Sequence, residues 1–370
     1  MTTHAVRRLG VEEEFQLIDL GTRRLTPRAP ELLAMLPGHY VEELQRCVVE
    51  TNSGVTGALD ELQADLADRR RVLVDTAESI GVGVVAAGSV PLVLPSEISV
   101  SSTPRYRQML QDYQLLAREQ LICGTQFHVD VRDRDEAIAI GNQLTGHLPT
   151  LLAISASSPF WATGEDTGYA SNRAMMFQQL PTAGLPFQFE TWAEYERYVD
   201  DLLVTGVIDE LKEVRWDLRP APHLGTLEVR VCDGVPTLHE IGALTALTQC
   251  LLVHLDDRLT DGGTIPTLPP WHVQENKWRT ARYGMDAIII LDARNRERLV
   301  TDELHDLLER LAPIARRLGC SDELAAVEDI IRVGASYQRQ QAVAAAHDGD
   351  LVEVTRSLVS EMRAGRPAGT

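Results

Sequence analysis

Residues 10–19 read GVEEEFQLID and place three adjacent carboxylates inside a short, otherwise apolar segment. Successive side chains of an extended strand point to opposite faces of a sheet. The segment therefore predicts a strand with Glu12 and Glu14 on a polar face and the apolar residues on the other. Glu13 falls on the apolar face or at its rim, so we expect it to matter least for metal binding.

Two carboxylates side by side on a covered strand face repel each other unless a cation or protons neutralise them. Mg²⁺ is the ion that fits this need most simply, because it prefers oxygen ligands. The alternative is a solvated acidic surface. With 54 acidic residues in 370, a run of three is expected about once by chance. The remaining sequence has to decide between the two.

Composition limits the possible partners. Only 35 basic residues balance the 54 acidic ones, and the net charge of −19 excludes nucleic acid or an anionic membrane as the main partner. No signal-peptide pattern opens the sequence and no apolar run is long enough to cross a bilayer, so we expect a cytoplasmic protein. The cysteines are odd in number and form no C-x-x-C pair, which predicts reduced core residues: Cys47, Cys123, Cys232, Cys250 and Cys320.

Three further segments alternate polar and apolar residues in the same way. Each is a predicted strand that offers a possible metal ligand on one face only. They are Val41–Ser53 with Glu50 and Asn52, Leu121–Val131 with Gln126, His128 and Asp130, and Leu224–Asp233 with Glu228 and Arg230.

Each of these residues also has a structural interpretation. A single histidine such as His128 is often a core residue, although an amide and a carboxylate on the same strand face favour a ligand. Arg230 can simply balance the charge of Glu228, or it can bind phosphate beside a metal-binding carboxylate. Both interpretations stay open at this level.

Helical periodicity separates the strands and dominates the last part of the sequence. We therefore predict an α+β fold with an antiparallel or mixed sheet whose polar faces line one concave site and whose other face is covered by helices. We expect residues 1–290 to form the core that carries the site and residues 291–370 a helical region packed on it, within one domain overall. The loop-rich stretch 159–186 is long enough to be a lid, and residues 363–370 form a flexible tail. Helices are expected at 57–80, 104–119, 133–157, 191–205, 237–259, from 275, and from 301 onward.

The polar strand faces would line one site on this sheet. Oxygen and imidazole ligands without thiolates suit two or three hard divalent ions better than structural zinc. The candidate ligands are Glu12, Glu14, Glu50, His128 and Glu228, and the candidate anion-binding residues are Arg173, Arg219 and Arg230.

Six segments within residues 9–290 resemble one family, the glutamate–cysteine ligases of type 2. They are GVEEEFQLID, VVETNSG, GTQFHVDV, SNRAMMFQQLPTAGLP, RWDLRPAPHLGTLEVRVCD and ENKWRTARYG. The resemblance implies a glutamine-synthetase-like fold, with a curved, mainly antiparallel sheet that forms the concave active site and is backed by helices. It further implies that the five candidates above are the metal ligands, with residues 1–290 as the catalytic core. It also implies catalytic roles for Arg230 and Arg173, and ATP contacts from Arg230, Lys277, Arg219 and Asn52.

The activity that the resemblance implies is ATP- and Mg²⁺-dependent joining of a carboxylate to an amine through an acyl phosphate. Glutamate and cysteine would give γ-glutamylcysteine, ADP and phosphate, although another amine can take the place of cysteine. A homo-oligomer is possible on this fold. The alternatives are a non-catalytic sensor of nucleotides or amino acids, and a metal-dependent hydrolase that does not need ATP.

Overall fold

The structure is a computed structural model and describes residues 7–93, 98–161, 164–262 and 268–368. Its centre is a seven-stranded sheet built around β1 (Leu9–Asp19), as the sequence predicted. β1 pairs with three strands, and every pairing in the sheet is antiparallel. The order is β2 (Tyr40–Glu42), β3 (Val48–Asn52), β1, β5 (Thr125–Asp130), β9 (Thr226–Val229) and β8 (Leu218–Ala221), with β4 (Val82–Val85) also beside β1.

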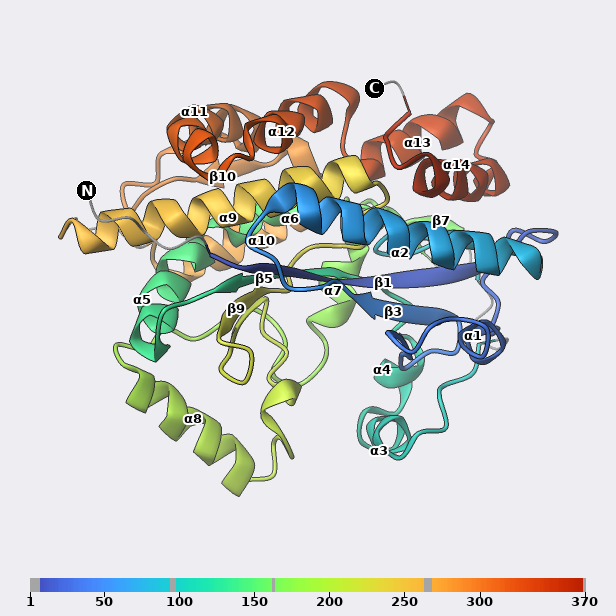
Figure 1. Cartoon of the computed structure of the whole chain (residues 1–370), viewed down its shortest axis with the longest axis horizontal. Coiled ribbons are helices and arrows are strands. Elements are labelled where there is room, and N and C mark those ends of the chain that lie inside the picture. Colours follow the sequence, from blue (N-terminus) through green and yellow to red (C-terminus); the bar gives the residue numbers. More distant parts are fainter. Residues whose placement is uncertain (1–6, 94–97, 162–163, 263–267, 369–370) are drawn as a thin grey trace.

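Two long helices, α2 (Leu59–Ser79) and α9 (Leu238–Thr260), cover one face of this sheet (Figure 1). The apolar side chains of β1 point to this face, where Val11 is packed in a core with Leu62 and Leu66 of α2. Burial of such side chains stabilises the fold by about 1.5–3 kcal/mol each. α9 is long and apolar enough to span a membrane, but 83% of its most apolar window is buried inside the protein. It is therefore a core helix.

A second layer of helices lies above the first (Figure 1). α11 (Val300–Leu318) and α12 (Ser321–Val333) pack on α9, and their Leu304 and Val327 belong to the same hydrophobic core as the sheet. α13 (Ser336–Ala346) packs on α14 (Leu351–Ala364), which contacts β4. The predicted flexible tail was wrong for residues 363–364, because α14 continues through them; residues 369–370 lie outside the described part of the chain.

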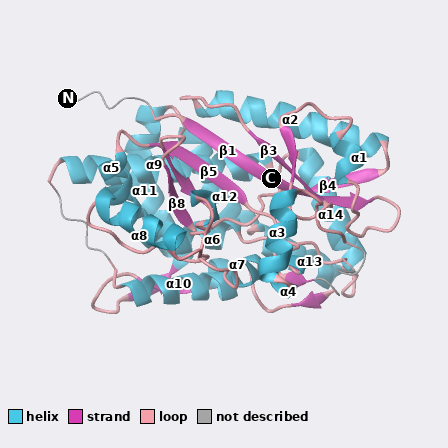
Figure 2. Cartoon of the chain, turned by 90° about the horizontal axis from the view of Figure 1, so that it is seen from below, coloured by secondary structure: helices cyan, strands magenta, loops and turns pink. Residues whose placement is uncertain are grey.

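The opposite face of the sheet is flanked rather than covered. α3 (Pro104–Tyr113) and α4 (Leu115–Arg118) lie along one side, and α8 (Trp192–Val204) lies along the other (Figures 1 and 2). The polar face of the sheet lies between them. The remaining elements are α1 (Ala29–Leu33), α5 (Arg134–Leu144), α6 (Leu148–Ser155), β6 (Phe160–Trp161), β7 (Glu165–Asp166), α7 (Asn172–Phe177), α10 (Pro270–Tyr283), β10 (Ile288–Ile290) and β11 (Glu297–Leu299).

Four local predictions need correction. The strand expected at 41–53 is two strands, β2 and β3, because the chain turns between them. The helix expected at 104–119 breaks at Gln114, whose φ of 48° is incompatible with a right-handed helix. The stretch 159–186 contains β6, β7 and α7 instead of being entirely loop, although residues 162–163 lie outside the described chain. The hairpin of β10 and β11 was not predicted, because its strands are only three residues long.

Candidate active site

The strand register aligns the polar residues of separate strands in rows across the open face. Glu12 on β1 lies opposite Asn52 on β3 and opposite Gln126 on β5. His128 lies opposite Glu228 on β9. Neighbouring strands therefore bring side chains that are more than 200 residues apart in sequence into one site.

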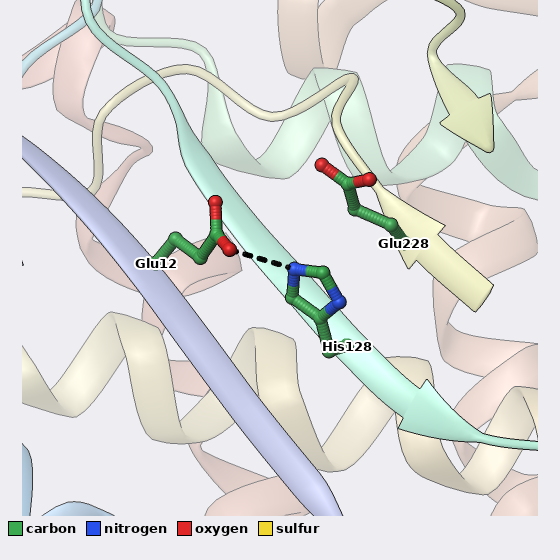
Figure 3. A group of neighbouring side chains, drawn as sticks. All are labelled: Glu12, His128 and Glu228. Carbon is green, nitrogen blue, oxygen red and sulfur yellow. Dashed lines mark ion pairs between the residues drawn. The ribbon is translucent and has the colours of Figure 1, made fainter. Parts of the chain in front are cut away.

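Glu12, His128 and Glu228 form a cluster whose potential ligand atoms all lie within 4.8 Å of one another (Figure 3). Nε2 of His128 lies 3.2 Å from Oε1 of Glu12. Nδ1 of the same ring lies 3.0 Å from Oγ1 of Thr226. With the Nδ1 proton directed at that hydroxyl, Nε2 presents its lone pair to the cluster, which is the arrangement usual for a metal-binding histidine.

Two arginines neutralise Glu228. Nε of Arg219 donates to Oε2 of Glu228 at 2.8 Å, and Arg230 donates to Oε1. Burial alone would raise the pKa of Glu228, but the charges of Arg230 and Arg219 outweigh this effect and lower the pKa to about 2. Glu228 is therefore ionised at neutral pH, as a metal ligand must be.

A second acidic group lies nearby and consists of Glu14, Glu50 and Glu43. Glu14 and Glu50 face each other across β1 and β3. Burial and, after it, the charge of Glu43 raise the pKa of Glu14, and the opposing effects of Arg173, the Gly124 N–H and Arg230 leave it at about 7. Burial and the charge of Glu43 also raise the pKa of Glu50 well above its usual value. Three carboxylates held this close need a cation or protons to compensate them.

Glu43 was not among the residues predicted from the sequence. A continuous strand over 41–53 would have placed it on the face opposite Glu50, because their positions differ by an odd number. The chain leaves the strand after Glu42 and re-enters it at Val48, and this interruption turns Glu43 toward the site. A predicted break in that strand is the signal that could have identified it.

Gly124 connects the second acidic group to Arg173. Its backbone N–H donates to Oε2 of Glu14 at 2.6 Å. A Cβ atom at this position would lie 2.3 Å from Nη2 of Arg173, so only glycine leaves room for the guanidinium. Arg173 also donates to the backbone oxygens of Val231 and Arg230, while its Nε has no hydrogen-bond partner in the described part of the chain.

Most of these groups line a cavity of about 470 Å³ in front of the open sheet face, namely Glu12, Glu14, Glu43, Glu50, Arg173, Arg219 and Arg230. The predicted ligands His128 and Glu228 lie beside Glu12 but are not among the lining residues. Its walls come from the sheet, from α3 and from the segments after α7 and before β8. The lining residues are Glu12, Glu14, Val41, Glu42, Glu43, Leu44, Gln45, Val48, Glu50, Arg105, Tyr106, Met109, Gln120, Ile122, Gln126, Arg173, Phe177, Leu180, Lys212, Arg215, Arg219 and Arg230.

Two predicted ATP contacts are not among the residues that line this cavity. Asn52 lies opposite Glu12, but it is exposed to solvent and is not among the residues that line the cavity. Lys277 is buried, and its Nζ lies 2.6 Å from Oδ2 of Asp217. Gln126 was noted on the polar face but not proposed as a site residue, and it accepts a hydrogen bond from Arg230 at 2.7 Å.

The donor set suits hard divalent cations. Carboxylate oxygens dominate both groups, one imidazole joins the first, and all five cysteines are buried and lie outside both groups. The predicted position of the cysteines in the core is thus confirmed. Nε2 of His128 makes no hydrogen bond within the described residues although it is buried, which is expected of an atom reserved for a ligand.

Two solved enzymes share this fold. A glutamate–cysteine ligase from Francisella tularensis, solved in complex with AMP, has a TM-score of 0.69 and 13% identity, covering 96% of this chain and 89% of that one. A bifunctional glutathione synthetase from Pasteurella multocida has a TM-score of 0.65 and 13% identity, covering 97% of this chain and 52% of that one. The chain thus shares its fold with these two enzymes, and together with the family match below this makes it an ATP-dependent carboxylate–amine ligase.

The sequence comparisons identify the family. The profile of glutamate–cysteine ligase family 2 matches residues 8–357, and the chain belongs to this family. A relative from Mycobacterium tuberculosis strain H37Rv, named "Putative glutamate--cysteine ligase 2", is 53% identical over 356 residues, which cover 96% of this chain and 94% of the relative. One of the same name from Mycobacterium ulcerans is 52% identical over 360 residues, which cover 96% and 91%.

Proposed function

We propose that this ligase uses ATP to activate the side-chain carboxylate of glutamate and joins it to the amine of cysteine, giving γ-glutamylcysteine, ADP and phosphate. One observation carries the proposal. Glu12 of the first acidic group, the three glutamates of the second group and the arginines Arg173, Arg219 and Arg230 line the same cavity. The names of the family and of its relatives supply the two amino acids.

In this proposal Mg²⁺ is held at two or three positions. Glu12, His128 and Glu228 would hold one ion, and Glu14, Glu50 and Glu43 would hold the rest. Bound Mg²⁺ supplies positive charge to the phosphate oxygens of ATP and so favours transfer of the terminal phosphoryl group.

The arginines position the reacting groups. Arg230 lies between Glu228 and Gln126, where its guanidinium can turn from these partners to the transferred phosphoryl group. Arg219 holds Glu228 ionised, and Arg173 is locked beside Glu14 by the absence of a side chain at Gly124. Fixed guanidinium groups of this kind stabilise charge that develops in the transition state.

The chemistry needs no nucleophile from the protein. A glutamate carboxylate oxygen attacks the terminal phosphorus of ATP, the bond to ADP breaks, and an acyl phosphate forms. The amine of the second substrate then attacks the acyl carbon and loses a proton, and phosphate leaves. The acyl phosphate must be protected from water, and we propose that the stretch 159–186 closes the cavity, because its Phe177 and Leu180 already line it.

Several expectations remain part of the proposal. Asn52 and Lys277 are proposed ATP contacts, and Lys277 would have to leave Asp217 to reach the cavity. Residues 1–290 are the proposed catalytic core and residues 291–370 a supporting helical region. We also propose a cytoplasmic protein that can form a homo-oligomer.

The decisive experiment measures ADP and phosphate release from ATP and Mg²⁺ with glutamate and a panel of amines that includes cysteine, and identifies the product by mass. Amine-dependent release with a product of the mass of γ-glutamylcysteine is expected. ATP binding without turnover on any amine would instead indicate a sensor. Cleavage of a substrate without ATP would indicate a hydrolase.

A further inference from the structure

Most cations that line the cavity are committed to protein carboxylates. Arg219 and Arg230 pair with Glu228, and Lys212 pairs with Glu210. Arg215 is different: it is only 7% exposed, yet no carboxylate of the described chain forms an ion pair with it. A buried charge without a counter-charge is costly, so a buried guanidinium at a cavity wall is expected to meet an anionic ligand.

The protein holds Arg215 in place but leaves most of its donors free. Its Nη1 donates to the backbone oxygen of Glu213 at 3.1 Å, and its guanidinium stacks 5.1 Å from the ring centre of Tyr113 on α3. Nε and Nη2 donate to no described residue and remain available to a ligand in the cavity.

The backbone at Arg215 is also held in place, by hydrogen bonds through the hydroxyl of Thr182. Its N–H donates to Oγ1 of Thr182 at 3.1 Å, and the same hydroxyl donates to the backbone oxygen of Glu213 at 2.6 Å. Thr182 has a φ of 64°, a left-handed conformation that is strained for a β-branched residue. Strained residues of this kind persist mainly where the surrounding structure needs a particular geometry.

We propose that Arg215 binds the α-carboxylate of the amino-acid substrate whose side-chain carboxylate is activated. This assignment rests on the proposed function and deepens it by naming what the enzyme recognises at the substrate's unreactive end. Planar guanidinium groups bind carboxylates through two parallel hydrogen bonds. Met109, Phe177 and Leu180 line the same cavity and offer apolar surface to the methylene groups of the substrate.

The position of Arg215 favours an amino acid over the phosphates of ATP. The arginines whose charges most strongly affect the pKa of Glu14 and Glu228 are Arg173, Arg219 and Arg230. Those arginines therefore lie next to the acidic groups, where Mg²⁺ and phosphate are expected. Arg215 is not among them, and it lies against Tyr113, the last residue of α3.

The test compares glutamate with 4-aminobutanoate, which has the same reactive carboxylate and lacks only the α-carboxylate. In Arg215→Gln we expect the KM for glutamate to rise on the order of 10- to 100-fold, as for loss of a charged hydrogen-bonding partner. Three other parameters do not depend on the α-carboxylate contact and should change less than about twofold. They are the KM for 4-aminobutanoate, the KM for ATP and kcat. Arg215→Lys should recover part of the glutamate KM.

A matched control is Arg134→Gln. Arg134 also stacks on an aromatic ring, 5.2 Å from the centre of Trp192, but it lies outside the cavity. This variant should leave both KM values unchanged. An equal rise in KM for glutamate and 4-aminobutanoate in Arg215→Gln would overturn the assignment, and so would a rise in the KM for ATP alone.

A binding measurement separates this inference from the proposed function. The rise in Tm caused by glutamate is measured with Mg²⁺ and a non-hydrolysable ATP analogue, so it requires no turnover. We expect wild type to respond to glutamate more than to 4-aminobutanoate and Arg215→Gln to respond to both equally. If the wild-type protein binds glutamate in this way but forms no amide, the proposed function fails and the assignment of Arg215 survives. A variant that keeps the wild-type preference refutes the assignment.

Discussion

Glu13 and Glu14 are neighbours in sequence and have opposite surroundings. Glu13 points to the helix-covered face, is fully buried, and lies 2.5 Å from Nη2 of Arg70 on α2. Glu14 points to the cavity, where Glu43 and Glu50 add negative charge. The same residue type thus forms a structural ion pair at Glu13 and is a candidate metal ligand at Glu14. What separates them is the charge that the fold places opposite each carboxylate.

The largest expected difference between the two faces is in catalysis. Glu14→Gln should reduce the rate of ADP formation on the order of 10³-fold, because it removes a ligand for the ion that neutralises phosphate charge. Its stability in Mg²⁺-free buffer should not fall, since a repelling charge has been removed. Glu31→Gln, on the exposed surface of α1, is the control and should be fully active. An active Glu14→Gln would remove Glu14 from the proposed site.

On the helix-covered face the expected effect is on stability. Glu13→Gln leaves the buried guanidinium of Arg70 without its counter-charge and should lower the free energy of unfolding by about 3–5 kcal/mol. Urea denaturation measures this value, and the folded fraction should retain its KM for ATP. The double variant Glu13→Leu with Arg70→Met should be more stable than Glu13→Gln. If it is less stable, the pair contributes more than mutual charge compensation.

Mg²⁺ binding should stabilise the protein through the carboxylates on the cavity face and not through Glu13. Binding of one ion at a concentration 100 times its Kd adds about 2.7 kcal/mol to the free energy of unfolding. Thermal denaturation with and without Mg²⁺ should show this gain in wild type and in the folded fraction of Glu13→Gln. Glu50→Gln should show a smaller gain. An equal gain in Glu50→Gln would place the ion elsewhere.

The last expected effect is a pH dependence to which the buried carboxyl group of Glu14 contributes. Burial and the charge of Glu43 raise its pKa from 4.5 to about 7 in the folded protein. The folded state therefore holds this proton more tightly than the unfolded chain does. In Mg²⁺-free buffer the resulting stability is present below pH 4.5 and is lost as the pH rises to about 7. Urea denaturation across this range should show the loss in wild type and a smaller loss in Glu14→Gln.

The faces of the strands could be predicted from sequence because alternation is a local property. The pattern correctly separated Glu13 from Glu12 and Glu14, and the strand register then brought His128 and Glu228 together. The partner of Glu13 could not be predicted, because Arg70 lies on a different element 57 residues away and its approach depends on how α2 packs.

Predictions failed where a short irregularity changed the direction of the chain. The break between β2 and β3 reversed the face of Glu43, and the unusual φ of Gln114 ended a helix that the apolar pattern would have continued. Lys277 belongs to a recognisable motif, yet the structure pairs it with Asp217 away from the cavity lining. Motifs indicate which residues gather in a region, but side-chain partners depend on packing that sequence does not encode locally.

Gly124 makes the site sensitive to a substitution that the fold itself tolerates. Its φ lies outside the left-handed range, so alanine can adopt its backbone conformation and such a variant should fold normally. The added methyl group would nevertheless displace the guanidinium of Arg173 from beside Glu14. A screen that selects only for soluble, stable protein would therefore retain this substitution while the ligase lost activity. At this position genetic variation can be harmful without leaving any trace in expression level or melting temperature.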